Sequence, residues 1–200
     1  MKFLLTALLL AAAAHAQAAA PVAKIQAMLA KPPVLCGVFE QTKHLAGMKK
    51  PLLASGRFCV VAGKGVVWRT LKPFANTLRL TRDEIVHFQG ERVAMRLQAS
   101  QEPTVRVINS VLFSLLSGDL SQLDKLFETD GTADASSWRV SLRAREPALA
   151  KAVGAIELDG AAYVKTIELN EASGDRTRIV FSNIKTGKDA LQPEEAALLQ

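Results

Sequence analysis

Hydrophobic and polar residues alternate in short runs through the first half of the chain, a pattern typical of half-buried β-strands. Two such runs, Val34 to Lys43 and Leu52 to Val61, flank a loop that holds Gly47 and Pro51. Strand-forming runs on either side of such a loop predict an antiparallel hairpin.

One register of this hairpin accounts for its cysteines and for the glycine opposite its first aromatic residue. It places Cys36 opposite Cys59, and Phe39 over the bare backbone of Gly56. Directly opposed residues share a face. One face then carries Leu35, Phe39, Phe58 and Val60, and the other carries Cys36, Val38, Glu40, Arg57 and Cys59. A slip by one residue would exchange the faces, so we prefer this register.

Further alternating runs predict two groups of short antiparallel strands. The first group continues with Val66 to Leu71, Thr77 to Thr81, Glu84 to Phe88 and Glu91 to Gln98. The second group comprises Ser137 to Ala144, Val153 to Leu158, Tyr163 to Leu169 and Arg176 to Ser182. Asp159-Gly160 and Ser173-Gly174-Asp175 are hairpin turn signals in the second group.

Helical spacing of apolar residues predicts the helices. They are Pro21 to Lys31, Thr104 to Leu116, Ser117 to Asp130, a turn within Arg145 to Val153, and the tail Pro193 to Leu199, with a polar loop at Gly131 to Ser136. The segment Thr104 to Leu116 is apolar almost all round, so it is either buried core or the cover of an apolar hollow. Its place between two groups of strands favours a cover.

The order of elements predicts an α+β fold that is mainly β: a strongly curved antiparallel sheet, or half-open barrel, covered by helices. No linker or repeat interrupts residues 19–200, so we expect one domain there.

The hairpin and the strand after it also carry a family resemblance. The stretches F-E-Q-T-K at 39–43, S-G-R-F at 55–58 and V-V-W at 66–68, with Pro73 beyond them, resemble the outer-membrane lipoprotein carrier (LolA-like) family. The resemblance implies a periplasmic carrier whose bent, incomplete barrel holds acyl chains under helices. Such carriers typically have a basic-Pro-x-x-aromatic-x-Trp motif, which residues 62–67 do not provide before Trp68. We therefore assign the role of this motif's arginine to no residue of this chain. The chain could then carry a client other than general lipoproteins.

The N-terminus has the pattern of a secretory signal peptide. Lys2 precedes the apolar run Phe3 to Ala14, which is shorter than the ~20 residues needed to cross a bilayer. Cleavage after a small-x-small site would remove residues 1–18. No cysteine precedes Cys36, so we expect no lipid attachment. These features predict a protein that is exported and then soluble, and the family resemblance implies the periplasm of a Gram-negative bacterium.

The two cysteines of an exported chain suggest one disulfide, Cys36–Cys59, worth ~3 kcal/mol in the chain-entropy model. A redox or metal site is the alternative, although no C-x-x-C is present.

The formal net charge is +6, and Arg79, Arg82, Arg92, Arg96 and Arg106 crowd one region. In an exported protein this charge fits anionic head groups or an acidic partner rather than nucleic acid, or it is simply a solvated face.

No motif of catalytic or metal-binding residues stands out. There is no G-x-S-x-G, phosphate-cradling loop or nucleotide fingerprint. His44 lies by the hairpin loop and His87 in a predicted strand, where neither is placed for catalysis. We therefore expect neither an enzyme nor a cofactor or metal.

An apolar concavity would instead serve binding. The candidate lining residues of the sheet are Phe39, Phe58, Val60, Trp68, Leu78, Leu80, Phe88, Met95 and Leu97. Those of the covering helices are Ile108, Leu112, Phe113 and Leu116. Ordinary core packing is the alternative explanation for each.

Together with these residues, the family resemblance implies a monomeric carrier of acylated lipoproteins or other lipids, with donor and acceptor proteins at the inner and outer membranes. The alternative is an interaction or regulatory module of the envelope with the same fold and no transported lipid.

Overall fold

The computed structural model describes residues 19–98, 100, 113–114, 120 and 123–200. Eleven antiparallel strands form one sheet in the order β6-β5-β4-β3-β2-β1-β11-β10-β9-β8-β7. The first group comprises β1 (Val34–His44), β2 (Leu52–Val61), β3 (Gly65–Lys72), β4 (Asn76–Leu80), β5 (Glu84–Gln89) and β6 (Arg92–Gln98). The second group comprises β7 (Phe127–Ala133), β8 (Trp138–Ala144), β9 (Ala155–Gly160), β10 (Val164–Asn170) and β11 (Arg176–Thr186).

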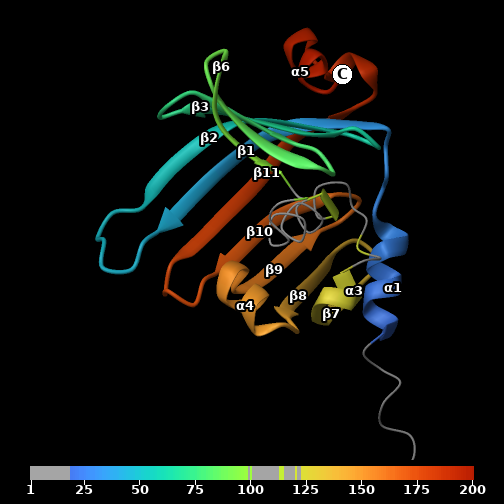
Figure 1. Ribbon diagram of the computed structural model, residues 1–200. Coiled ribbons are helices and arrows are strands. Elements are labelled where there is room, and N and C mark those ends of the chain that lie inside the picture. Colours follow the sequence, from blue (N-terminus) through green and yellow to red (C-terminus); the bar gives the residue numbers. More distant parts are fainter. Residues whose placement is uncertain (1–18, 99, 101–112, 115–119, 121–122) are drawn as a thin grey trace, which may run out of the picture.

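Pairing of β1 with β11 joins the two groups of strands into this single sheet. The sheet bends strongly, so that β1–β6 and β7–β10 face each other across its concave side (Figure 1). Within the described part of the chain β6 and β7 are its two edges, and the barrel does not close. The predicted mainly β, half-open architecture is therefore confirmed.

Short helices flank the sheet. They are α1 (Ala19–Met28), α3 (Leu123–Leu126), α4 (Pro147–Val153), the 3₁₀-helix η2 (Lys188–Ala190) and α5 (Pro193–Leu198). The first of these, α1, lies beside β7, and its Ile25 is fully buried in the main core. The helix α5 lies on the convex side of β1–β6 (Figure 1). In the described part of the chain no helix is long and apolar enough to cross a membrane.

The predicted hairpin register is confirmed. Cys36 pairs with Cys59, Phe39 with Gly56 and Val38 with Arg57. Leu35, Phe39, Phe58 and Val60 belong to the main core on the concave face, whereas Cys36 and Cys59 pack in a separate small cluster with Val34. The alternation of side chains along both strands produces this separation.

One predicted helix, Ser117 to Asp130, is wrong in its last part, and its residues 117–119 and 121–122 lie outside the described residues. Within the prediction Ser117 to Asp130, the structure has the short helix Leu123–Leu126, and the chain then continues as β7. This strand also takes up half of the predicted loop Gly131 to Ser136. Phe127 is fully buried, and β7 pairs with β8 along its whole length. Pairing with a neighbouring strand outweighs the local helical spacing that suggested a helix.

A predicted turn and a predicted helix differ from the structure or lie partly outside the described residues. Asp159-Gly160, predicted as a turn, ends β9 instead, and a side chain at Gly160 would meet the Trp138 ring that packs there. Of the predicted helix Thr104 to Leu116, Phe113 and Ser114 are helical, and residues 104–112 and 115–116 lie outside the described residues. A helical cover over the sheet therefore stays a prediction, as does the signal peptide at residues 1–18.

Candidate functional site

Aromatic side chains from four strands meet on the concave face of the sheet. The rings of Phe39 and Trp68 stack with their centroids 3.9 Å apart. Phe58 lies 4.8 Å from Phe181, and Trp68 meets the Phe181 ring edge-on at 6.0 Å. These four rings, from β1, β2, β3 and β11, form the aromatic cluster.

Glycines in the first hairpin make room for this cluster. Phe39 packs over Gly56, where an added Cβ would lie 2.9 Å from the ring and would also collide with the carbonyl oxygen of Arg69. Phe58 packs in the same way over Gly37, with 2.8 Å to an added Cβ. Small residues opposite large ones let the rings lie flat on the sheet, so local sequence determines the cluster.

Apolar residues of the next strands extend the same face toward the β6 edge. Trp68 pairs with Leu78, and Leu80 pairs with Val66, so Leu78 and Leu80 lie beside the aromatic cluster. Met95 and Leu97 follow through pairing with His87 and Ile85. Burial decreases toward this edge, from Val60 and Leu80, which are buried, to Met95, which is 44% exposed.

Phe88 departs from the expected lining. It pairs with Thr77 on the opposite, convex face, and the Arg79 guanidinium lies 5.9 Å from its ring centroid. A β-bulge follows between His87 and Phe88 where β5 pairs with β6. In its place, the imidazole of His87 is on the concave face, between Leu78 and Met95 in the pairing.

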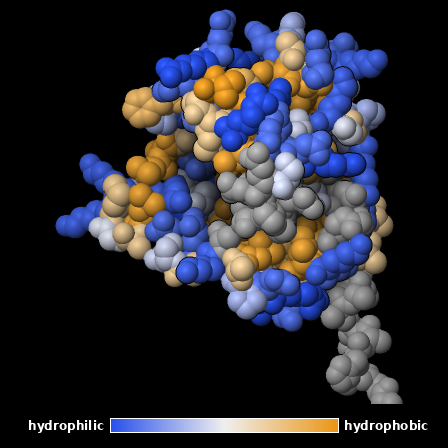
Figure 2. All heavy atoms as spheres, in the orientation of Figure 1, coloured by the Kyte–Doolittle hydropathy of each residue, from blue (hydrophilic) through white to orange (hydrophobic). Residues whose placement is uncertain are grey.

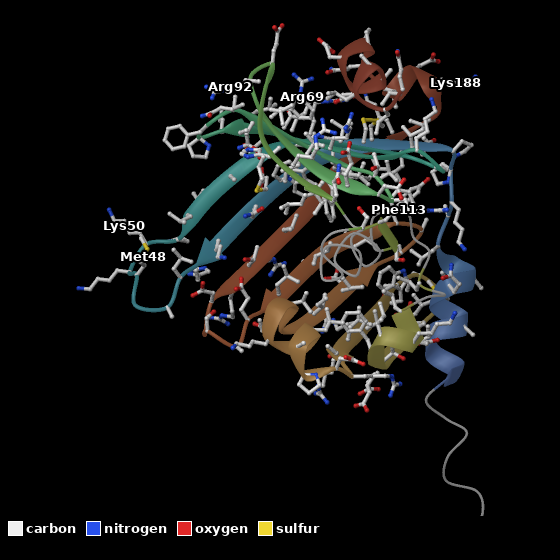
Figure 3. All side chains as sticks on the ribbon, viewed as in Figure 1. Met48, Lys50, Arg69, Arg92, Phe113 and Lys188 are labelled. Carbon is white, nitrogen blue, oxygen red and sulfur yellow. A yellow bond between two sulfur atoms is a disulfide. The ribbon has the colours of Figure 1, made fainter. Side chains whose placement is uncertain are left out.

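The predicted helical lining is described at one position. Phe113 is partly buried against the main core and lies between the two parts of the sheet (Figure 3). Ile108, Leu112 and Leu116 lie outside the described residues.

The second half of the sheet adds apolar residues to the same face, and these were not among the candidate lining residues predicted from sequence. The pairing of Phe39 with Phe181 carries the apolar face onto β11. It continues through Ile179, Ile167, Leu158 and Val140 on successive strands. Figure 2 shows hydrophobic residues gathered where the two parts of the sheet face each other. Alternation in these runs was visible, but the β1–β11 pairing that joins them to the hairpin was not.

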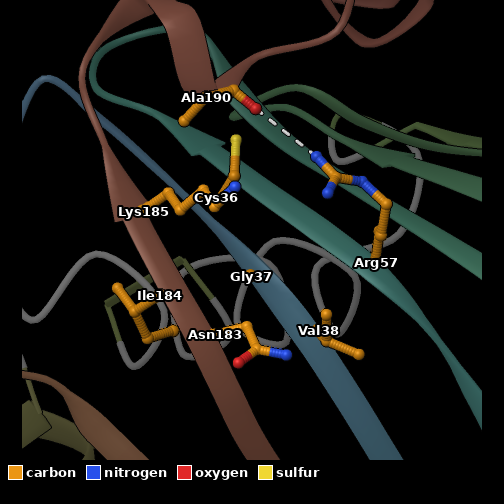
Figure 4. A pocket seen from close by; sticks show the side chains of 8 residues that line it. All are labelled: Cys36, Gly37, Val38, Arg57, Asn183, Ile184, Lys185 and Ala190. Atoms are coloured by element: carbon orange, nitrogen blue, oxygen red, sulfur yellow. Dashed lines mark hydrogen bonds between the residues drawn. The ribbon is translucent and has the colours of Figure 1, made fainter.

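The convex face carries the disulfide and a cavity of about 560 Å³ (Figure 4). Cys36 and Cys59 are joined by a disulfide, as predicted. Residues of β1, β2, β11 and η2 line the cavity: Cys36, Gly37, Val38, Arg57, Asn183, Ile184, Lys185 and Ala190. Arg57 donates from Nη2 to the carbonyl oxygen of Ala190 at 3.4 Å.

Three residues at this cavity, Cys36, Cys59 and Glu195, are close enough together to be considered as metal ligands. The ligand atoms of Cys36, Cys59 and Glu195 lie within 4.8 Å of one another, and all three residues are buried. The two sulfur atoms are bonded to each other, however, and a metal ligand would have to be a thiolate. With the disulfide formed, these residues do not fit a metal ion.

Ion pairs account for part of the arginine cluster noted in the sequence. Glu84 accepts from Arg79 and, at 2.7 Å, from Arg96. Among the residues that the structure describes, Asp134 in the exposed β7–β8 loop has a strongly lowered pKa. Backbone hydrogen bonds from Ser136 and Ser137, each 2.7 Å, lower the pKa of its carboxyl group to about 2. This carboxylate organises a turn, which is a structural role.

The fold and the site define a class of protein: a half-open antiparallel barrel with a largely apolar concave face. A family model described as outer membrane lipoprotein carrier protein LolA-like matches residues 11–200. The chain therefore belongs to the LolA-like family. This description is one of carriers and not of enzymes.

Solved structures match the chain at low identity, and no curated protein sequence matches it. A LolA superfamily protein from Nitrosomonas europaea is 9% identical over 92% of this chain and 97% of its own, with a TM-score of 0.46. A putative outer membrane lipoprotein-sorting protein domain from Vibrio parahaemolyticus is 11% identical over 90% and 97%, with a TM-score of 0.46. The Pseudomonas aeruginosa MucA/MucB complex matches at 14% identity over 92% and 61%, with a TM-score of 0.46.

Proposed function

We propose that this protein is a periplasmic carrier that binds the acyl chains of lipoproteins or other lipid-linked molecules and moves them toward the outer membrane. The observation that carries the proposal is the apolar concave face around the aromatic cluster. Membership of the LolA-like family supports it. In this proposal residues 1–18 are removed on export, and the monomer exchanges its ligand with donor and acceptor proteins at the two membranes.

Burial of hydrocarbon supplies the driving force for binding. Each buried methylene contributes ~0.8 kcal/mol, so an acyl chain is held by on the order of 10 kcal/mol before the costs of ordering it. Binding that strong must also be reversible in a carrier. The gradient of exposure from the aromatic cluster to Met95 suits this need, because methionine adapts to ligands of different shape. A ligand chain would leave across this edge without breaking the sheet.

Fluorescence of Trp68 tests the proposal directly. Trp68 is partly buried on the concave face, within the aromatic cluster. Trp138, the other tryptophan, lies on the same face but in β8, where it is 3% exposed and donates from Nε1 to the carbonyl oxygen of Ala161 at 2.6 Å. A fatty acid brominated along its chain should quench Trp68 on binding. In Trp68→Phe the remaining emission, from Trp138, should be quenched much less.

Chemical analysis of the native ligand completes the test. The protein should be purified from the periplasm of the bacterium that naturally makes it and extracted with organic solvent. The extract should contain an acylated molecule detectable by mass spectrometry. If the extract holds no lipid and the brominated fatty acid quenches neither tryptophan, the protein is not an acyl-chain carrier. A stoichiometric protein partner in the same preparation would then identify it as an interaction module.

A further inference from the structure

The loop between β1 and β2 exposes large apolar side chains at its tip. All residues from 46 to 53 are exposed. Met48 is 52% exposed, Leu52 49% and Leu53 63%. Figure 3 shows Met48 and Lys50 at the end of this loop, which projects beyond the neighbouring strands. A projecting group of apolar side chains in a protein surface indicates an interaction site.

The same tip is basic. Lys49 and Lys50 follow Met48, and no Asp or Glu occurs in the sequence between Glu40 and Asp83. In the part of the chain that the structure describes, neither lysine forms an ion pair. The adjoining β10–β11 turn carries Glu171 and Asp175, and both pair with Lys43.

These two acids hold the base of the tip in place. Asp175 accepts a hydrogen bond from the backbone N–H of Ala46 at 2.9 Å, and Glu171 accepts one from Lys43 Nζ at 3.2 Å. The backbone N–H of Met48 donates to the carbonyl oxygen of Leu45 at 3.0 Å and closes a turn. The β10–β11 turn thus braces the β1–β2 loop, and its apolar and basic side chains are presented in a fixed arrangement.

An apolar path leads from the tip to the aromatic cluster. Leu52 pairs with Lys43 and Phe58 with Gly37 in one uninterrupted register, so alternate residues of β2 share the concave face. These residues are Leu52, Ala54, Gly56, Phe58 and Val60. None of them is polar, and the row ends beneath the aromatic rings.

We propose that the tip of the β1–β2 loop docks the protein on the surface of a bilayer containing anionic phospholipid. Lys49 and Lys50 contact the lipid phosphates, while Met48, Leu52 and Leu53 enter the boundary between head groups and acyl chains. The row along β2 then guides an acyl chain between the bilayer and the concave face. This last step rests on the function proposed above, whereas docking itself does not.

The combination of charge and apolarity favours a lipid surface over a protein partner. Basic residues beside an anionic leaflet each strengthen binding by about fivefold. Lysine stems reach past apolar neighbours to place their ammonium groups at the phosphates, as lysines at membrane interfaces do. Because neither lysine is neutralised within the described residues, their full charge is available to the membrane.

Flotation with lipid vesicles tests the docking, with the disulfide-bonded protein and no acyl ligand. We expect binding to vesicles of phosphatidylglycerol and phosphatidylcholine in equal parts, and little to phosphatidylcholine alone. K49E/K50E should weaken binding at least ~25-fold, since two attractions of about fivefold are lost. M48S/L53S should weaken it roughly tenfold, and both side chains are exposed enough for folding to be unaffected.

A matched control changes the same charge at the other end of the sheet. Lys64 lies in the β2–β3 turn, and Lys188 follows Gly187, whose N–H bonds to Val34 at the start of β1. K64E/K188E should bind vesicles nearly as the unmodified protein does. Raising the salt from about 0.1 M to about 1 M shortens the Debye length from ~10 Å to ~3 Å and should weaken binding of the unmodified protein more than that of K49E/K50E.

Three results would overturn the docking proposal: no binding to anionic vesicles, equal binding to neutral ones, or equal losses in K49E/K50E and K64E/K188E. An acidic protein captured with the same lysine dependence, but without vesicle binding, would assign the tip to a protein partner. Quenching of Trp68 by brominated fatty acid, measured without vesicles, reports the carrier function separately. It should be unchanged in K49E/K50E, so failure of one proposal does not imply failure of the other.

Discussion

The carboxylate of Glu195 in α5 lies 3.2 Å from Nε of Arg57 in β2. The Glu195 side chain is 1% exposed and that of Arg57 is 27% exposed. Glu195 also accepts the backbone N–H of Gln192 at 3.0 Å, which caps α5. Its Oε2 is 3.0 Å from Sγ of Cys59, so the pair fastens the C-terminal segment over the disulfide.

Removing the two partners of this pair should have unequal effects. Arg57→Ala leaves a buried carboxylate without its cation and should lower the free energy of unfolding by ~3 kcal/mol. Glu195→Ala leaves a guanidinium that water can reach, and the loss should be ~1–2 kcal/mol, including the lost helix cap. Urea unfolding followed by circular dichroism measures both losses.

An exposed ion pair provides the control. Arg178 lies 3.1 Å from Glu168, and both side chains are more than a third exposed. Arg178→Ala should change stability by less than ~1 kcal/mol. Equal losses in Arg57→Ala and Arg178→Ala would mean that Glu195 is hydrated in solution, contrary to its burial here.

The disulfide should contribute a separate share of stability. It closes a loop with a sequence separation of 23 between Cys36 and Cys59, for which the chain-entropy model gives ~3 kcal/mol. C36A/C59A should lose about this amount in urea unfolding. Adding a reductant should bring the unmodified protein close to that variant and leave the variant itself unchanged. A reductant effect on the variant would contradict this interpretation.

The local part of the fold could be predicted from sequence because short-range patterns determine it. The cysteines and the Phe39–Gly56 match selected one hairpin register, and alternation then assigned each side chain to a face. The concave position of Phe39, Phe58 and Trp68 follows from the same two rules. The aromatic cluster was therefore half predicted before any long-range pairing was known.

The rest depends on contacts between distant segments. Phe181 joins the cluster because β11 pairs with β1, a choice that no local pattern encodes. Phe127 heads a strand despite its helical spacing, because β8 offers it a partner. Phe88 was assigned to the lining because it is an apolar strand residue. It pairs with Thr77, however, which lies on the same face of β4 as Arg79, and this is the convex face. The burial of Glu195 against Arg57 likewise depends on a contact between distant segments and became evident only in the fold.

The turn at Asp134 should be sensitive to acid. Hydrogen bonds from Ser136 and Ser137 hold the pKa of Asp134 at about 2, below the ~3.9 of an unfolded chain. A lowered pKa in the folded state stabilises it above pH ~4, and this contribution is lost as pH falls through about 2. Asp134→Asn should therefore lower Tm at neutral pH, and the difference from the unmodified protein should shrink toward pH 2. A difference that is independent of pH would show that the charge of Asp134 is not involved.

Gly56 should tolerate no side chain, because two strands and a ring approach it. An added Cβ would collide with the carbonyl oxygen of Arg69 in β3 and would lie 2.9 Å from Cε1 of Phe39. Gly56→Ala should therefore cost ~3 kcal/mol, as overpacked cores do, and displace Phe39 from Trp68. Near-ultraviolet circular dichroism and urea unfolding measure the two effects.

Gly63→Ala separates this steric effect from the general loss of a glycine. Gly63 has φ +74° and nothing within 4 Å of an added Cβ, so only the left-handed backbone opposes alanine, at ~1–2 kcal/mol. Its near-ultraviolet spectrum should be unchanged, since the substitution is remote from the stacked rings. If Gly56→Ala kept both the spectrum and the stability, β2 and β3 would have to lie farther apart. The close packing of Phe39 on Gly56, which positions the aromatic cluster, would then be incorrect.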